Sequence, residues 1–172
     1  MTPSIVILAG GGPAPGINTV ISTVAKTFLK DGYRVIGLHE GYKNLFKDNP
    51  KFVDMDFIYA DQIMRMGGSA LQMSRYKPKD DEFNTDFFVK NNVKLLVTIG
   101  GDDTASTANR ISKFLAANNV KIQNIHVPKT IDNDIFGTDV TFGFHSAVDI
   151  ATDVVDRIHT TANSHGRVML IE

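Results

Sequence analysis

The chain has 172 residues, 42% of them hydrophobic and 22% charged, so it is long enough to bury one core and too apolar for a disordered segment. Its 18 basic and 19 acidic residues leave a formal net charge of −1, which gives no reason to expect a nucleic-acid or anionic-membrane partner. The chain contains no cysteine, which excludes disulfides and thiolate zinc sites, and its first apolar run is too short for a signal or membrane segment. We therefore expect a cytoplasmic protein that binds neither nucleic acid nor membrane.

The first half of the chain begins with an alternation of strand and helix patterns. Residues 5–8 predict a strand that runs into three glycines, and apolar side chains at helical spacing predict a helix over residues 17–29. Residues 34–38 predict a second strand. The segment 43–79 is irregular and rich in charged residues, methionine and glycine, which is typical of a long functional loop with a strand or a short helix inside it.

The second half continues the alternation. The predicted helices cover residues 84–91, 104–117 and 142–161, and the predicted strands cover residues 94–99, 121–127 and 167–171. Strands that are continuously apolar and alternate with helices indicate a parallel sheet covered on both faces. We therefore expect an α/β fold with an open, mostly parallel sheet and helices on both faces, a Rossmann-like three-layer sandwich.

Ligands of such sheets bind beyond the carboxyl ends of the strands, near the point where the strand order reverses. Three turns follow predicted strands, at residues 10–16, 100–104 and 128–134, and they become candidates for a single site. The first turn reads GGGPAPG, and its glycines allow backbone N–H groups to approach a phosphate closely. Glycines at this place also serve simple tight packing.

The second turn, GGDDT, places two carboxylates where a phosphate is expected. A carboxylate beside a phosphate requires a cation between them, and Mg²⁺ prefers carboxylate and phosphate oxygens. Asp102 therefore predicts a magnesium site. The alternative is that Asp102 and Asp103 only cap the following helix, where the dipole favours acids.

The third turn, PKTIDND, is the densest polar cluster of the chain. Lys129, Thr130, Asp132 and Asp134 can together supply a phosphate clamp, an alcohol contact and a general base. The alternative is an ordinary turn rich in Asn and Asp. The five histidines fit no metal-binding spacing, and we interpret them as structural or surface residues.

The motifs GGGPAPGIN, EGY, GGDDT, PKTIDND, GTDVTFGFHSA and SHGR, in this order, resemble those of the phosphofructokinase family. The resemblance implies a phosphofructokinase-like fold and in-line phosphoryl transfer to fructose 6-phosphate. It implies that Asp132 accepts the proton of the sugar 1-hydroxyl and helps to bind the sugar. It also implies that Thr130 and Asp134 hold the sugar phosphate and the reacting centre.

The resemblance assigns further residues to the phosphoryl donor and the metal. It places Mg²⁺ at Asp102 and phosphate contacts at the backbone of Gly11 and Gly12. Arg75 resembles the arginine that bridges the transferring phosphoryl group. Arg167 resembles an arginine that reaches the sugar phosphate of a neighbouring subunit, so a homo-oligomer, a dimer or a tetramer, is expected.

Two residues depart from the ATP-using members of the family. Those members have glycine in place of Asp103, and many have glycine in place of Lys129. Asp103 would fill the room of an α-phosphate and repel it, and Lys129 adds charge suited to a short, highly charged donor. The pair resembles the pyrophosphate-dependent branch, which transfers a phosphoryl group from pyrophosphate to fructose 6-phosphate and gives fructose 1,6-bisphosphate.

Two alternatives stay open at this point. One is an ATP-dependent 6-phosphofructokinase. The other is a phosphate-binding module without turnover, because family members continue into a second α/β region on the sugar-phosphate side that residues 1–172 do not contain. We expect residues 1–172 to form the amino-terminal, donor-binding region of a phosphofructokinase and to be inactive alone.

Overall fold

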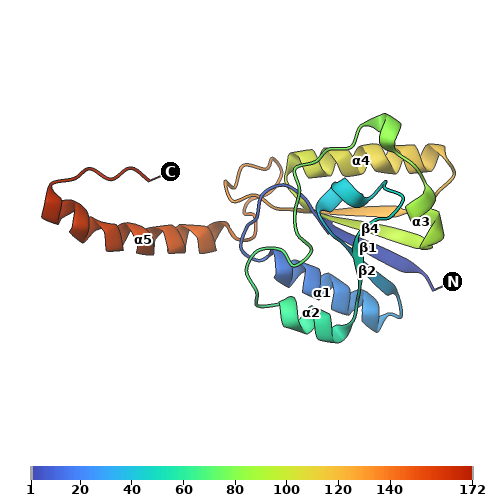
Figure 1. Cartoon of the computed structure of the whole chain (residues 1–172), viewed down its shortest axis with the longest axis horizontal. Helices are drawn as coiled ribbons and strands as arrows, with labels where there is room; N and C mark the ends of the chain where they lie inside the picture. The colour runs from blue at the N-terminus through green and yellow to red at the C-terminus, as the bar shows by residue number, and fades with distance from the viewer. Residues whose placement is uncertain (1, 172) are drawn as a thin grey trace.

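The computed structural model describes residues 2–171 and contains a five-stranded sheet between two layers of helices (Figure 1). The strands are β1 Ser4–Ala9, β2 Arg34–Leu38, β3 Phe52–Met55, β4 Val93–Gly100 and β5 Gln123–Pro128. The α-helices are α1 Ile17–Lys30, α2 Phe57–Ile63, α3 Asp86–Lys90, α4 Asp102–Ala117 and α5 Phe144–His165. Two 3₁₀ helices, η1 Gly41–Asn44 and η2 Asp80–Glu82, lie in the connections.

The strand order in the sheet is β3-β2-β1-β4-β5. β1, β2, β4 and β5 are parallel, and β3 pairs with β2 in the antiparallel direction. The predicted fold is therefore confirmed. The irregular segment, for which a strand or a short helix was expected, contains both, β3 and α2. The strand order reverses between β1 and β4, so the turns that follow these two strands lie side by side at the switch point.

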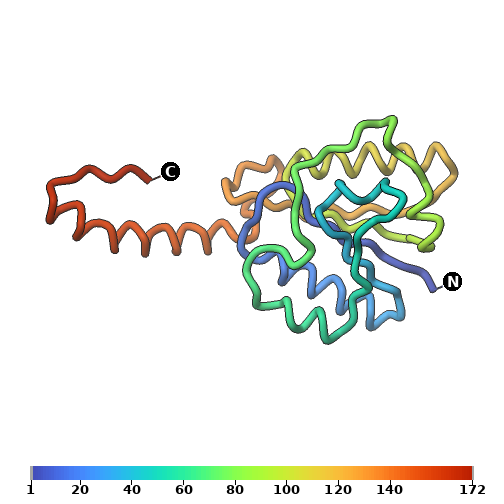
Figure 2. Tube along the Cα trace, in the orientation of Figure 1, coloured from blue at the N-terminus to red at the C-terminus, as the bar shows by residue number. Residues whose placement is uncertain are grey.

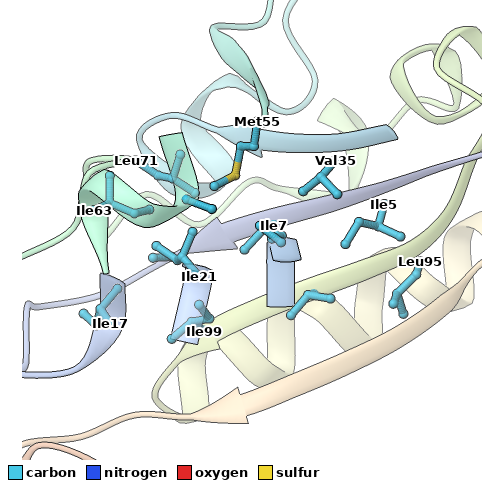
Figure 3. Packing of buried hydrophobic residues seen from close by; sticks show 14 residues of the cluster. Ile5, Ile7, Ile17, Ile21, Val35, Met55, Ile63, Leu71, Leu95 and Ile99 are labelled. Atoms are coloured by element: carbon cyan, nitrogen blue, oxygen red, sulfur yellow. The ribbon is translucent and has the colours of Figure 1, made fainter. Parts of the chain in front are cut away.

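The core lies on both faces of the sheet because successive side chains of a buried strand point to opposite sides. Ile5 and Ile7 of β1 face α1, where they pack with Ile17 and Ile21 (Figure 3). The neighbouring β1 side chains, Val6 and Leu8, belong to the cluster under α3 and α4. Each such side chain contributes about 1.5–3 kcal/mol on burial, so the sheet is a rigid support for the turns at its edge.

Helix α5 projects from the end of the sheet where the carboxyl ends of the parallel strands lie (Figure 2). It starts after Gly143, whose φ of 88° and close approach to the carbonyl of Pro15 leave no room for a side chain. No residue of α5 is buried. Within residues 2–171, no membrane-spanning helix is found, because none is both long and apolar enough.

The strand predicted over residues 167–171 is wrong for this structure, in which these residues pair with no strand. A strand needs a hydrogen-bonded neighbour, and α5 carries this segment away from the sheet (Figure 2). The predicted helix of residues 104–117 begins two residues earlier, at Asp102, and that of residues 142–161 runs from Phe144 to His165.

Candidate functional site

The turns after β1 and β4 are joined directly to each other. The backbone N–H of Gly10 donates to the carbonyl of Ile99 at 2.9 Å. Thr104 of α4 is buried against both turns, and a Cβ on Gly10 would lie 2.8 Å from its Oγ1, closer than real contacts allow. A Cβ on Gly100 would collide with the same side chain. These glycines are therefore needed to seat the start of α4 at the edge of the sheet.

Asp102 and Asp103 are the first two residues of α4, and Gly101 is the N-cap residue. Neither carboxylate makes a side-chain capping hydrogen bond, although both lie at the positive end of the helix dipole. The structure therefore shows no capping hydrogen bond from these acids, but it does place them where the helix dipole favours negative charge. Both side chains are exposed. Asp103 forms an ion pair with Lys77, in which Lys77 Nζ lies 2.6 Å from Asp103 Oδ2.

Lys129 connects the third turn to the first two. Its backbone N–H donates to the carbonyl of Gly100 at 2.8 Å, and its Nζ donates to the carbonyl of Gly12 at 2.6 Å. The residue is only 6% exposed. Burial lowers the pKa of Lys129, the Asp132 carboxylate opposes that shift, and the Arg75 guanidinium adds to it. The ammonium group is thus bonded to Gly12, and the charges of Asp132 and Arg75 both act on it.

The rest of the third turn is held by hydrogen bonds within the turn. Thr130 Oγ1 donates to Asp134 Oδ1 at 2.8 Å and accepts from the backbone N–H of Asp132 at 3.3 Å. Thr141 Oγ1 donates to the carbonyl of Thr130 at 2.6 Å. The Asp132 side chain stays exposed at the tip of this turn, so its carboxylate is accessible to an incoming alcohol.

The switch point contains a cleft of about 360 Å³. Its charged lining residues are Arg75, Lys77 and Asp103, and Gly11 forms part of its wall. A Cβ on Gly12 would lie 3.8 Å from Nη2 of Arg75. Arginine, a glycine-rich turn and the start of a helix thus converge on one space, which is suited to phosphate groups.

The structure brings most of the predicted site residues to one edge of the sheet. The residues gathered there are Gly11, Gly12, Arg75, Asp102, Asp103, Lys129, Thr130, Asp132 and Asp134. Arg167 is not among them. It follows α5, a helix of 22 residues and roughly 33 Å in length that leads away from the sheet (Figure 1). Its predicted contact with a neighbouring subunit stays a prediction.

Lys77 and Tyr42 also line the cleft and were not predicted. Lys77 pairs with Asp103, and Tyr42 donates from its hydroxyl to the carbonyl of Thr104 at 2.8 Å. The sequence contained a signal for Lys77. Arg75 was assigned to the donor, and a residue two positions later in an extended segment points to the same side. Tyr42 lies in the EGY motif but carries no local signal of its contact with α4.

His126 of β5 was interpreted as structural or surface, and the structure gives it a place beside the site. Its Nε2 lies 3.0 Å from the carbonyl of Gly100, and its Nδ1 lies 2.9 Å from Thr98 Oγ1. Because a carbonyl only accepts, Nε2 carries the proton and Nδ1 accepts from the threonine hydroxyl. Burial lowers the pKa of His126, while the bond to Gly100 and the charge of Asp102 oppose that shift.

The donor set of the site is suited to a metal held mainly by substrate. Within residues 2–171 no group of three or more His, Asp or Glu side chains is arranged to enclose an ion. Mg²⁺ commonly binds through one or two carboxylates together with substrate phosphates and water. The exposed carboxylate of Asp102, next in the chain to the cleft residue Asp103, fits such a site.

Comparison with known proteins shows the family of the chain. The family model described as phosphofructokinase matches residues 4–172. The chain belongs to the phosphofructokinase family. This is the family whose motifs the sequence resembles.

Relatives in this family carry names with different phosphoryl donors. An ATP-dependent 6-phosphofructokinase 2 of Clostridium perfringens is 42% identical, over 98% of this chain and 48% of its own length. A pyrophosphate–fructose 6-phosphate 1-phosphotransferase of Naegleria fowleri is 41% identical, over 98% of this chain and 40% of its own length. The chain thus spans about half the length of these curated relatives, and identity does not choose between the donors.

The fold is also found in solved structures. A pyrophosphate-dependent phosphofructokinase from Nitrosospira multiformis superimposes with a TM-score of 0.80 at 23% identity. The match covers 95% of this chain and 42% of that protein. This likeness shows the shared fold, and it leaves the donor to be argued from the residues of the cleft.

Proposed function

We propose that the protein containing this chain transfers a phosphoryl group from pyrophosphate to the 1-hydroxyl of fructose 6-phosphate. The products are fructose 1,6-bisphosphate and phosphate. The observation that carries the choice of donor is the position of Asp103, whose carboxylate lines the cleft beside Gly11 and Arg75. An acid in this position, paired with Lys77, fills the space that the additional phosphate of a nucleotide would need, which favours the shorter donor.

The proposed donor site consists of the first glycine turn, Arg75 and Lys129. The backbone of Gly11 and Gly12 would face the donor phosphates, and the Arg75 guanidinium lies beside this turn, 3.8 Å from where a Cβ on Gly12 would stand. Lys129 adds a buried positive charge and fixes the turn through its bond to Gly12. In-line phosphoryl transfer requires mainly positioning and neutralisation of charge, and these residues supply both.

The proposed base is Asp132. Its carboxylate is exposed, and it lies close enough to Lys129 to act on the pKa of that residue. This proximity to Lys129 supports a base next to the donor phosphate, where the proton of the attacking hydroxyl would be released. The Thr130 hydroxyl and the Asp134 carboxylate, which bond to each other in this structure, would turn to the sugar phosphate when it binds.

Asp102 is the residue that would hold Mg²⁺ together with the donor phosphates. The ion would neutralise charge on the phosphates when bound. We also propose that residues 1–172 are the donor-binding region of a longer enzyme, because the chain spans about half of its relatives. The same proposal includes that Arg167 contacts the sugar phosphate of a neighbouring subunit in a homo-oligomer. It also includes that the enzyme is cytoplasmic.

ATP is the second candidate donor, because relatives with ATP-dependent names match as well as those named for pyrophosphate. One experiment separates the two. Purified protein of the full encoded length is given fructose 6-phosphate and Mg²⁺ with either pyrophosphate or ATP, and fructose 1,6-bisphosphate is measured. Product formed with pyrophosphate at a kcat/KM well above that with ATP supports the proposal, and the reverse order refutes it.

A further inference from the structure

The segment that carries Arg75 and Lys77 is fastened across the cleft at both ends. At the first end, the backbone N–H of Gly11 donates to the carbonyl of Ser74 at 3.1 Å. At the other end, Arg110 of α4 donates to the carbonyl of Pro78 at 3.1 Å and from Nε to Asp80 at 3.0 Å. The backbone of Lys77 is thus fixed between the glycine turn and α4.

The side chain of Lys77 meets Asp103 over this cleft. Nζ lies 2.6 Å from Oδ2, and both residues line the cleft. The side chains are 53% and 75% exposed, so the pair is solvated and adds little to the stability of the fold. The pair matters for the cleft instead. The ammonium group of the connecting segment and the carboxylate at the start of α4 occupy the same part of it.

The charges of the cleft are therefore divided into two parts. Near the glycine turn, Arg75 lines the cleft, and the buried Lys129 bonds to Gly12 without lining the cleft itself, so this part suits a polyanion. The part near α4 contains the mutually neutralised pair of Lys77 and Asp103. Without Lys77, the carboxylate of Asp103 would face the incoming donor without compensation and would repel it.

We propose that Lys77 is a specificity-determining residue that acts with Asp103. The ion pair occupies the cleft beyond the space for two phosphates, and Lys77 neutralises Asp103 so that this acid excludes a longer donor without repelling pyrophosphate. This inference rests on the proposed function, since it concerns the same donor. It differs from that proposal in assigning a role in donor selectivity to a residue outside the GGDD and PKTIDND motifs.

The first test compares Lys77→Met with Lys79→Met in the full-length protein. Lys79 carries the same charge two residues later but does not line the cleft, so it is the matched control. With inorganic pyrophosphate as the variable substrate, we expect kcat/KM to fall about tenfold in Lys77→Met, mainly through KM, because the interaction acts on ground-state binding. Lys79→Met should match the wild type, and Lys77→Arg should restore most of the loss because it keeps the charge.

The second test places Lys77→Met in an Asp103→Asn background. If Lys77 works by neutralising Asp103, its loss should cost less than about threefold there, because no carboxylate remains to be compensated. An equal loss in both backgrounds would overturn the inference, and so would a Lys77→Met enzyme indistinguishable from Lys79→Met while pyrophosphate remains the donor. A wild-type enzyme that uses ATP alone would instead overturn the proposed function. Thermal melting of each variant confirms that the fold is retained.

Discussion

Replacing Gly12 by alanine separates the catalytic use of the glycine turn from its structural use. Gly12 is not in the left-handed region, and a Cβ placed there meets Nη2 of Arg75 at 3.8 Å, an ordinary contact. The substitution therefore fits the fold without strain. Because alanine restricts the unfolded chain, it should raise the free energy of unfolding by about 0.4–1 kcal/mol.

The same methyl group should damage activity. A phosphate oxygen that bonds to both the Gly12 turn and Arg75 needs about 2.9 Å to each nitrogen, and the methyl group would stand between them. We expect kcat/KM for the donor to fall at least tenfold, or about 1.4 kcal/mol of transition-state stabilisation. Steady-state assays of fructose 1,6-bisphosphate formation and a thermal melt of the same preparation measure both effects.

Two control variants make this prediction specific. Gly67→Ala makes the same change at a glycine that has no neighbour within 4 Å and no left-handed φ, so it should raise the free energy of unfolding by a similar amount, about 0.4–1 kcal/mol, and leave activity unchanged. Gly11→Ala should lower stability by about 1–2 kcal/mol, because its φ of 82° is strained for any side chain. Full activity in Gly12→Ala would refute the reasoning, since the phosphate could not then lie between Gly12 and Arg75.

Three further predictions follow from other residues of the site. Asp103→Gly should raise kcat/KM with ATP relative to pyrophosphate by about tenfold, and an unchanged donor ratio would contradict the role given to this acid. Asp132→Asn should lower kcat by ~10²–10⁴-fold with little change in the affinity for fructose 6-phosphate, and near-normal turnover would move the base elsewhere, to Asp134 first. The pKa of His126 in the fold lies below its ordinary value of 6.5, so as the pH falls the unfolded chain binds a proton at this residue before the folded chain does. The free energy of unfolding therefore decreases as the pH drops below 6.5. His126→Gln should make the acid side of the stability curve less steep, and parallel denaturation curves for both proteins from pH 7 to 5 would contradict this.

The sequence by itself determined the elements that local patterns encode. Buried strands such as residues 5–8 and 94–99, and amphipathic helices such as residues 17–29, follow from hydrophobic periodicity and lie within β1, β4 and α1. The alternation of strands and helices then determined the fold class. It also placed three polar turns at the carboxyl edge, because parallel strands all end on one side of a sheet.

Other features depended on contacts between segments that are remote in the sequence. Lys129 reaches the carbonyl of Gly12, 117 residues away, because β1 and β4 are neighbours and β5 lies next to β4. The pairing of Lys77 with Asp103 depends on the anchoring of an irregular segment by Arg110, which has no periodic signal. The apolar residues 167–171 have strand composition but remain unpaired, because α5 leads them away from the sheet. Local patterning selects the type of each element, whereas its partners are set by the packing of the whole sheet, which only the tertiary structure decides.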